Sequence, residues 1–524
     1  MKRIGLIALA ATTLLTAPVR ATSLGPRTGP AEWIPVRDPV QRELELLNAS
    51  GLADTAFARH TRPLDRRSVA AVVARARRLH PDSRDPALVR LEREFGRELV
   101  DWGYDSPAGY TPPLATLADT TAGEGGMRAR LFGYADGALV VTRRFTQFED
   151  RSRIGGRLNL TSGGLLLHLD AYAGRVVDGD RFSDQLVTGS EFIAYSENTY
   201  GSLAGHGLDV TLGRLGFAWG PGAQSLLWSA AADPITALTF GGTLLGHLRA
   251  TALQGDIDAS QGERIAGHRL EWFPSPRLTV GLAEAARYRS AHWEPLYVLG
   301  LLPYTWVQRI VAHDQLDRPG ADAATSRNNV MAAVDAAWQA RPGTVLYGQF
   351  LLDDQGLGRS GYPTRVGYQA GTLLTGALGA GRWSGRAEYS RVHRYVYSVF
   401  YGEDFIHHGK PIGFPGGPDS RTLTLDGTWA PSASWEFGIA GAAQDLGEGR
   451  LGEFFDPDSG AASGSRLSGV VERARSLGGS ARFWPRDGMD FSIEATRAWV
   501  ENFGHVPGVN ARRSSVRLAV RLRR

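Results

Sequence analysis

The chain has 524 residues, far more than one ordinary globular domain, yet its mean hydropathy is only −0.21 and 65 of its residues are glycine. It contains no cysteine, which excludes a disulfide framework, cysteine-based zinc or iron–sulfur sites and thiol catalysis. The net charge of +4 comes almost entirely from arginine, because Lys2 and Lys410 are the only lysines, and this excess identifies no nucleic-acid partner.

The first residues have the pattern of a secretory signal peptide. A basic pair precedes an apolar run from Ile4 to Leu15, and Val19-Arg20-Ala21 follows that run. The run is too short for a stable membrane helix, so a membrane anchor is the less favoured alternative. We therefore predict that residues 1–21 direct export and take no part in the fold.

Residues 22–126 are predicted to form a small helical region in the periplasm. Three aspartates, Asp38, Asp65 and Asp85, precede short amphipathic segments whose helices they can cap. Pro39 and Pro86 follow two of them, at the position that favours a first helical turn. Apolar residues recur three and four apart in each segment, so every helix needs a surface to pack on.

From about residue 127 the apolar period changes from 3.6 to 2 and stays there to the end of the chain. Leu423 and Leu425, for example, alternate with threonines. About eighteen such segments occur, whereas open sheets rarely exceed about ten strands. Unpaired peptide groups in hydrocarbon also cost several kcal/mol each. The predicted fold class is therefore an all-β transmembrane barrel of about 18 antiparallel strands over residues 127–524.

The predicted strands are separated by short turns and long connections in alternation. Pro/Gly-rich segments such as Arg341-Pro342-Gly343 fit the tight periplasmic ends of a barrel. The longer polar stretches 173–186, 402–420 and 446–471 would then lie outside the cell. Aromatic residues at strand ends suit the two membrane interfaces, namely Trp272, Phe273, Trp338, Tyr401, Trp429, Trp484 and Trp499.

Several short motifs, in order along the chain, resemble the Wzi capsule assembly family. They are Trp33-Ile34-Pro35-Val36, the segment from Leu212-Gly213-Arg214 to Trp219-Gly220-Pro221-Gly222, Gly267–Trp272, and Tyr347–Phe350. The resemblance covers most of residues 33–354, while residues 355–524 match only in strand rhythm. It implies an outer-membrane barrel with an N-terminal helical region and a role in capsule assembly. One departure is the C-terminal Leu522-Arg523-Arg524, where outer-membrane barrels commonly carry an aromatic residue.

Two predicted loops hold the candidate polysaccharide contacts. Aromatic and cationic side chains on an exposed loop can bind an acidic polymer by stacking and ion pairing. The candidates are Trp293, Tyr304 and Trp306 in the connection 289–327, with Phe405, His407, His408 and Lys410 in a Gly/Pro-rich loop. The alternative is that these loops fold over the barrel mouth and pack on themselves.

Three further groups have structural interpretations. Trp219-Gly220-Pro221-Gly222 is interpreted as a turn or barrel kink, with a sugar-binding loop as the alternative. Arg269 and Glu271 share one side of a strand and are interpreted as a lumen charge pair rather than an active site. Carboxylates without EF-hand spacing are interpreted as solvated loop residues rather than a calcium site, and these are Asp353, Asp354, Glu403, Asp404, Asp456 and Asp458.

No hydrolase, nucleotide-binding or metalloprotease motif occurs, so the sequence predicts neither catalysis nor a cofactor or metal. The leading hypothesis is a monomeric, non-enzymatic outer-membrane protein, surrounded by outer-membrane lipid, that binds capsular or other surface polysaccharide and assists its assembly or attachment. A passive diffusion channel is the first alternative, because side chains alone cannot fill so wide a lumen. A barrel hydrolase acting on lipid or glycan is the second.

Overall fold

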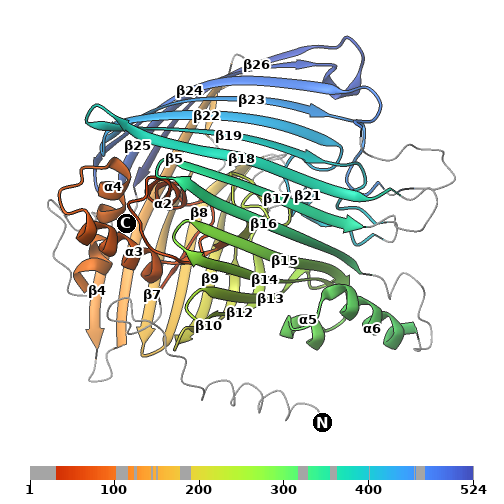
Figure 1. The fold of residues 1–524 in the computed structure, drawn as a ribbon, viewed down its shortest axis with the longest axis horizontal. Coiled ribbons are helices and arrows are strands. Elements are labelled where there is room, and N and C mark those ends of the chain that lie inside the picture. Colours follow the sequence, from red (N-terminus) through yellow and green to blue (C-terminus); the bar gives the residue numbers. More distant parts are fainter. Residues whose placement is uncertain are drawn as a thin grey trace, which may run out of the picture.

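The structure is a computed structural model, shown as a ribbon in Figure 1. It describes residues 31–101, 116–122, 127–142, 146–148, 152–177, 190–316, 328–354, 363–399, 402–453, 455 and 466–522. The predicted signal peptide, Tyr401, Asp456 and Asp458 lie outside the described residues.

Eighteen long antiparallel strands of the described residues form a closed barrel, as predicted. They are β5 (Met127–Thr142), β7 (Arg153–Ser162), β8 (Leu165–Val177), β9 (Ser190–Gly205), β10 (Leu208–Leu215), β12 (Ile235–Leu244), β13 (Leu248–Asp258), β14 (Glu263–Ser275), β15 (Leu278–Arg289), β16 (Asn329–Arg341), β17 (Thr344–Asp354), β18 (Arg365–Leu378), β19 (Gly381–Val392), β22 (Ser420–Ser432), β23 (Trp435–Leu446), β24 (Glu472–Arg486), β25 (Met489–Glu501) and β26 (Ala511–Leu522). The last strand, β26, closes the ring on β5, from Ser515 opposite Thr142 to Leu522 opposite Ala135. Two short strands, β4 (Thr116–Ala122) and β6 (Thr146–Phe148), also pair with β5.

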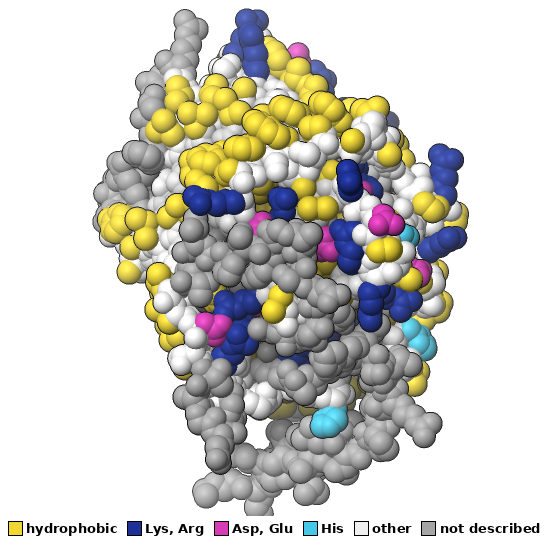
Figure 2. Space-filling view, turned by 90° about the vertical axis from the view of Figure 1, so that its left-hand side faces the viewer, with side chains coloured by type: hydrophobic (Ala, Val, Ile, Leu, Met, Phe, Trp, Pro, Cys, Tyr) yellow, Lys and Arg dark blue, Asp and Glu magenta, His cyan; other side chains and the backbone are white. Residues whose placement is uncertain are grey.

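The two faces of the wall follow the alternation in the sequence. In β22 and β23, Leu423, Leu425 and Ile439 are exposed on the outer face, while Thr424 and Asp426 point to the lumen side. Leucine, isoleucine and valine repeat this exposed pattern around the ring, which fits an outer wall that meets lipid. Figure 2 looks toward the end that carries the N-terminal helices: hydrophobic side chains form a band over the upper wall, and most basic side chains lie below that band.

The two ends of the barrel differ in their connections. At one end, here called the short-turn end, strands are joined by tight turns such as Pro342-Gly343 and Asp487-Gly488. At the opposite, long-connection end lie the segments between β10 and β12, β15 and β16, β19 and β22, and β23 and β24. The Pro/Gly-rich turns and the described parts of the stretches 402–420 and 446–471 therefore lie at opposite ends of the barrel, while most of the stretch 173–186 lies outside the described residues.

Three helices pack together at the short-turn end (Figure 1): α2 (Val40–Ala49), α3 (Arg66–Leu79) and α4 (Pro86–Asp101). Asp65 caps α3 by accepting the Ser68 N–H at 2.8 Å, and Asp85 accepts the Ala87 N–H at 3.0 Å. Their apolar faces share a core that includes Leu47, Val73, Leu88 and Phe95. Three very short strands accompany them, β1 (Trp33–Ile34), β2 (Thr61–Arg62) and β3 (Leu64–Asp65).

Two further helices, α5 (Pro295–Leu299) and α6 (Tyr304–Leu316), lie on the outside of the wall beside β13 to β16 (Figure 1). Tyr297, Tyr304 and Val307 pack on the outward-facing Ala266 and Ala286. No helix in the described part of the chain is both long and apolar enough to cross a membrane.

Two of the predicted interface aromatics face inward instead. Phe273 is buried, and the Trp484 ring is covered by the Arg90 guanidinium, which lies 4.7 Å from the ring centre. A strand end alone does not predict the outer face, because the period of two also places every second aromatic on the lumen side.

Candidate functional site

Two segments from opposite ends of the barrel occupy its lumen. One belongs to the N-terminal region, defined as residues 31–101. The other is the connection between β10 and β12, residues 216–234, called here the plug segment; it includes the short strand β11 (Ala218–Trp219). Strands β11 and β2 pair, with Ala218 opposite Arg62 and Trp219 opposite Thr61, so the two segments share a small sheet inside the barrel.

The plug segment is built around two buried tryptophans. The Trp219 N–H donates to the Trp228 carbonyl at 2.9 Å, and the ring centres are 5.2 Å apart. A Cβ on Gly267 of β14 would lie 2.6 Å from the Trp219 ring, so glycine at this position makes room for the indole. The Trp219 indole is therefore packed inside the barrel wall and is not presented to solvent.

Polar side chains of the wall hold the tip of the plug segment. Gln349 of β17 donates to the Pro221 carbonyl at 2.5 Å and accepts the Leu226 N–H at 3.2 Å. Glu388 of β19 accepts the Ala223 N–H at 2.9 Å. Gly220 has a φ of 113°, and a Cβ there would lie 2.7 Å from the Gln349 carbonyl oxygen, which accounts for glycine in this tight turn.

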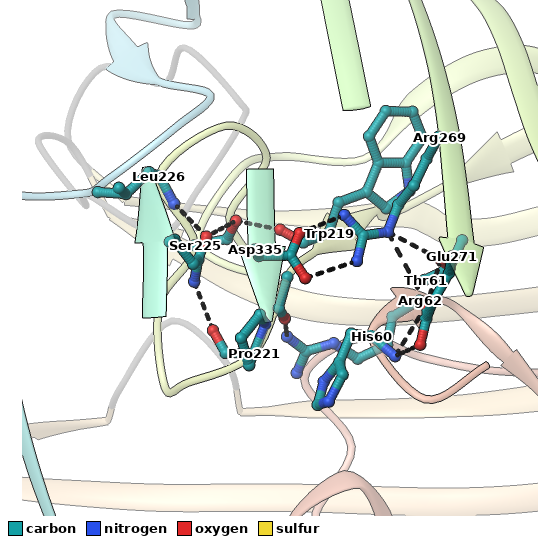
Figure 3. Close-up of polar contacts among 12 residues, drawn as sticks. His60, Thr61, Arg62, Trp219, Pro221, Ser225, Leu226, Arg269, Glu271 and Asp335 are labelled. Carbon is teal, nitrogen blue, oxygen red and sulfur yellow. Dashed lines mark hydrogen bonds and ion pairs between the residues drawn. The ribbon is translucent and has the colours of Figure 1, made fainter. Parts of the chain in front are cut away.

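The two lumen segments meet at a network of buried charges (Figure 3). The Arg269 guanidinium donates to both Asp335 oxygens, at 2.6 and 3.0 Å, and to the Thr61 hydroxyl at 2.9 Å. Glu271 accepts the Arg59 N–H at 2.9 Å, the His60 N–H at 3.1 Å and the Thr61 hydroxyl at 2.6 Å. Arg269 and Glu271 lie 3.9 Å apart, so the predicted lumen pair is one edge of a larger network.

His60 belongs to this network but contributes no charge to it. Burial, together with the nearby Arg59, Arg62 and Arg269, holds the pKa of His60 well below its usual value. The Gly220 N–H donates to the His60 carbonyl at 2.8 Å, and the Arg62 guanidinium donates to the Gly220 carbonyl at 3.0 Å. The backbone polar groups of both segments thus find partners in each other.

The helices of the N-terminal region are bound to strands around the ring. Arg42 and Arg90 both pair with Glu436 of β23, at 2.7 and 3.3 Å. Glu45 pairs with Arg386 of β19, and Gln339 of β16 donates to the Ala49 carbonyl at 2.9 Å. On the other side, Trp33 donates through its indole to Thr211 of β10 and Glu32 accepts from Asn159 of β7. The region therefore spans the lumen.

At the long-connection end, a short hairpin ties the plug segment to the wall. The hairpin consists of β20 (Ile406–His407) and β21 (Lys410–Pro411). Lys410 pairs with the buried Asp233 at 3.1 Å, and His408 approaches the same carboxylate at 3.3 Å. Burial alone would raise the pKa of Asp233, but the hydrogen bond from His408 and the charge of Lys410 outweigh it and lower the pKa. Burial and the neighbouring His408 lower the pKa of His407 to about 3.

Asp233, His407 and His408 place possible ligand atoms within 4.8 Å of one another, a set that could hold a metal ion. The Lys410 ammonium pairs with Asp233, so the positive charge beside this carboxylate comes from the protein itself. The sequence predicted no metal site and did not bring these residues together.

The candidate polysaccharide contacts are scattered rather than gathered. Tyr304 packs under α6 on the outer wall and Phe405 packs against Trp228, so both rings are fully buried. Neither ring is available to a sugar, which corrects the expectation that both lie on exposed loops. Trp306 is 61% exposed on α6, on the outside of the wall. His408 and Lys410 keep part of their surface exposed at the hairpin, and the half-buried Trp293 donates its indole N–H to Asp256 at 2.9 Å.

The carboxylates considered for calcium are engaged in loop structure. Asp353 accepts the Tyr397 N–H at 2.8 Å, and Asp404 accepts the Val399 N–H at 2.9 Å. Glu403 is buried and pairs with Arg289 at 3.1 Å. These side chains hold the connection between β19 and β22 rather than standing free in solvent.

Sequence reasoning missed the residues that hold the plug segment. Gln349, Gln369 and Glu388 lie on neighbouring strands, and Gln369 donates to the Gln224 carbonyl at 2.8 Å. Their alternation with apolar residues indicates a lumen-facing position, which is a usable signal. It does not indicate which segment they contact, because the partners are more than a hundred residues away.

Comparison with known proteins supports one family. The family described as capsule assembly protein Wzi matches residues 146–514. The solved structure of Wzi from Escherichia coli, an outer-membrane protein involved in group 1 capsule assembly and described as a carbohydrate-binding β-barrel, has a TM-score of 0.61 and 14% identity, covering 94% of this chain and 99% of that one. OprD from Pseudomonas aeruginosa has a TM-score of 0.44 and 10% identity, covering 78% and 97%. OccD3 from the same organism has a TM-score of 0.42 and 12% identity, covering 79% and 96%.

No curated protein matches the sequence. The family match covers more than half of the chain, and the likeness to the Escherichia coli barrel concerns the same fold. The chain belongs to the Wzi capsule assembly family and is an outer-membrane β-barrel.

Proposed function

We propose that the protein binds capsular or other surface polysaccharide at its long-connection end and helps to assemble or hold that polymer at the cell surface. The single observation that carries this proposal is the meeting of the N-terminal region and the plug segment inside the lumen. Because the lumen is filled from both ends, the barrel offers no open pore to a polymer. The polymer is therefore expected to bind the exposed surface at the long-connection end. Membership of the capsule assembly family agrees with this function.

We further propose that the N-terminal region lies in the periplasm and the long connections lie outside the cell. The support is the position of α2 to α4 beside the tight turns, because outer-membrane barrels have short periplasmic turns and longer extracellular loops. In this orientation the hairpin of β20 and β21 is at the outer surface. The protein would act as a monomer surrounded by outer-membrane lipid and would have no enzymatic activity.

The polysaccharide contacts we propose are His408, Lys410 and Trp293. His408 and Lys410 belong to the hairpin that lies over Asp233, and Trp293 lies over the end of β13. A cation, an imidazole and an indole suit an acidic glycan, which is bound by ion pairing and by stacking on sugar faces. Tyr304, Phe405 and His407 are left out of this set because they are buried, and Trp306 is left out because it lies on the outside of the wall.

The test compares the hairpin variant H408A/K410A with the control H206A/R341A. The control also removes one histidine and one positive charge, but at the short-turn end. Both control residues are exposed. We expect the hairpin variant to retain several-fold less acidic polysaccharide on whole cells and in a pull-down with purified polymer, while the control behaves like the unaltered protein. Equal retention by all three proteins would contradict the proposed contacts, and no binding by the unaltered protein would contradict the proposed function.

A further inference from the structure

An arginine cluster lies on the outside of the barrel at the long-connection ends of β22 to β26. In the pairing of the strands, Arg421 stands opposite Asp445, Asp445 opposite Arg473, and Arg473 opposite Glu501. One row nearer the short-turn end, Arg475 stands opposite Trp499, and Trp499 opposite Arg512. In the next row, Leu477 stands opposite Arg497.

These side chains share the outer face with the lipid-facing band. Because side chains alternate along a strand, Arg421 is on the same face as the exposed Leu423, and Arg475 on the same face as the exposed Leu477. The side chains of Arg421, Arg473 and Arg475 are 52%, 49% and 45% exposed. Arg497 and Arg512 are also exposed. None of the five belongs to the charge network of the lumen.

The cluster has more positive than negative charge. Asp445 pairs with Arg421 at 2.7 Å and with Arg475 at 2.8 Å, and Glu501 lies 3.7 Å from Arg473. Arg497 stacks on the Trp499 ring at 5.3 Å. Among the described residues, Arg497 and Arg512 have no carboxylate partner. Five guanidinium groups are thus balanced by two carboxylates, which leaves donors and positive charge for an anion.

The height of the cluster corresponds to a membrane interface. A strand rises about 3.3 Å per residue, and a tilt of about 40° reduces this to about 2.5 Å along the membrane normal. About ten residues separate the cluster from the tight turns, so it lies about 25 Å above them, near the upper edge of an apolar band of that height. The exposed Ile493 and Leu518 face each other in the band below the cluster, and Leu477 lies level with Arg497 at its lower edge.

We propose that this arginine cluster binds the phosphate groups of a phosphorylated glycolipid in the outer leaflet, whose acyl chains lie against the apolar band below. Guanidinium groups bind phosphate through paired hydrogen bonds, and the arginines here are presented sideways toward lipid rather than upward to the barrel mouth. The apolar band under the cluster suits a molecule with both a phosphate and acyl chains. The inference rests on the orientation proposed above and not on the polysaccharide role.

The experiment uses the full-length protein in detergent, with lipid A carrying two phosphates as the probe and enzymatically dephosphorylated lipid A as its match. Bound lipid is measured by native mass spectrometry, and the melting temperature is recorded with and without each lipid. The variant is R475Q/R497Q/R512Q. The control, R277Q/R341Q/R486Q, removes three exposed arginines at the short-turn end.

We expect the unaltered protein and the control to bind phosphorylated lipid A at least tenfold more tightly than the dephosphorylated form, and the cluster variant to lose that preference. Equal binding of both lipids by the unaltered protein would overturn the proposal without reference to any variant. The proposal would also be overturned if the cluster variant kept the full preference for phosphorylated lipid A. A third outcome is that the cluster variant binds lipid A unchanged but no longer binds a soluble acidic polysaccharide. This result would assign the cluster to that polymer and overturn the proposal.

Discussion

At the scale of single residues, the lumen is held together by buried charges that each have several partners. Glu271 is fully buried and accepts three hydrogen bonds from residues 59–61 of the N-terminal region. Removing one partner of a buried charged set is far more destabilising than removing an exposed ion pair, because the remaining groups stay buried without compensation. The contribution of a charged side chain to the stability of this protein therefore depends on how deeply it is buried.

Replacing Glu271 with alanine is expected to loosen the N-terminal region. The backbone N–H groups of Arg59 and His60 would lose their acceptor, and the buried Arg269 guanidinium would lose a counter-charge. We expect a cost of about 3 kcal/mol in the free energy of unfolding. We expect faster tryptic cleavage within residues 59–66 and a lower melting temperature in detergent. E494Q, which alters a half-exposed carboxylate 3.7 Å from Arg517, is the control and should change little. A variant as resistant to trypsin as the unaltered protein would show that Glu271 is not needed for attachment.

His407 is expected to make the hairpin sensitive to acid. Its pKa is about 3 in the folded protein and near 6.5 when unfolded, so the unfolded chain takes up a proton that the folded protein does not. The stability it contributes is present above about pH 6.5 and falls as the pH drops toward 3, by about 2 kcal/mol at pH 5. The lowered pKa of Asp233 acts in the same direction nearer pH 3.8, since that carboxylate must stay ionised to pair with Lys410.

We expect H407Q to lose less melting temperature than the unaltered protein between pH 7.5 and pH 5. The glutamine side chain does not titrate in this range, so its variant lacks the proton uptake of the unfolded histidine. H80Q, at the end of α3, serves as the matched control and should keep the full pH dependence. Identical pH profiles for all three proteins would rule out His407 as the acid-sensitive group.

At the scale of elements, α5 and α6 cover a part of the outer wall that lipid could not solvate. Beneath them, His268 of β14 lies 2.9 Å from Glu284 of β15, and Glu284 accepts the Tyr304 N–H at 2.7 Å. Both polar side chains are outward-facing, on the face where neighbouring positions carry exposed leucines. The helices cover these polar groups, and the Tyr304 N–H donates to Glu284. The outer side of the helices is apolar and replaces this part of the wall as the surface that faces lipid.

The exposed side of these helices is expected to contact lipid. Leu301 is 80% exposed, and Leu299, Trp306 and Ile310 are exposed beside it, next to the apolar band of β13 to β16. Because the chain has no cysteine, a single spin label at L301C can be placed without altering other residues. In liposomes we expect it to collide with oxygen more than with a water-soluble nickel chelate. A label at V506C, in the exposed connection between β25 and β26, should show the opposite preference. Water-type accessibility at both positions would contradict the prediction.

At the scale of the whole molecule, the barrel is stabilised from within as well as by its wall. The plug segment contributes Trp219, Leu226 and Trp228 to a core that also includes wall residues such as Leu253 and Leu351. The N-terminal region adds ion pairs to strands around the ring. The diffusion-channel hypothesis requires an open path, and these two segments meet across it.

In planar bilayers the unaltered protein is expected to give no steady open-state current. Replacing residues 217–232 with a short Gly-Ser linker removes the plug tryptophans and the pairing of β11 with β2, so we expect frequent openings. The same linker in place of residues 503–508, all of which except His505 are exposed, should leave the protein silent. Steady porin-like current through the unaltered protein would restore the channel hypothesis.

The fold was predictable because its signals are local. Asp65 and Asp85 cap helices as expected, and alternation such as Leu423 and Leu425 with threonines appears as an exposed outer stripe. The candidate site was far less predictable. Phe405 and Tyr304 have the composition of binding aromatics but are buried, since composition does not reveal which loops fold onto the wall.

By itself, the sequence predicted a closed barrel with an apolar outside, because a period of two fixes the face of every side chain and the number of strands exceeds what an open sheet holds. Only the tertiary structure decided which residues meet in the lumen. Glu271 and Thr61 are separated by 210 positions, and Gln349 and Leu226 by 123. A periodic pattern gives the face of a strand but neither the height of a residue nor its partner across the barrel, and those depend on ring closure and on how the two lumen segments pack.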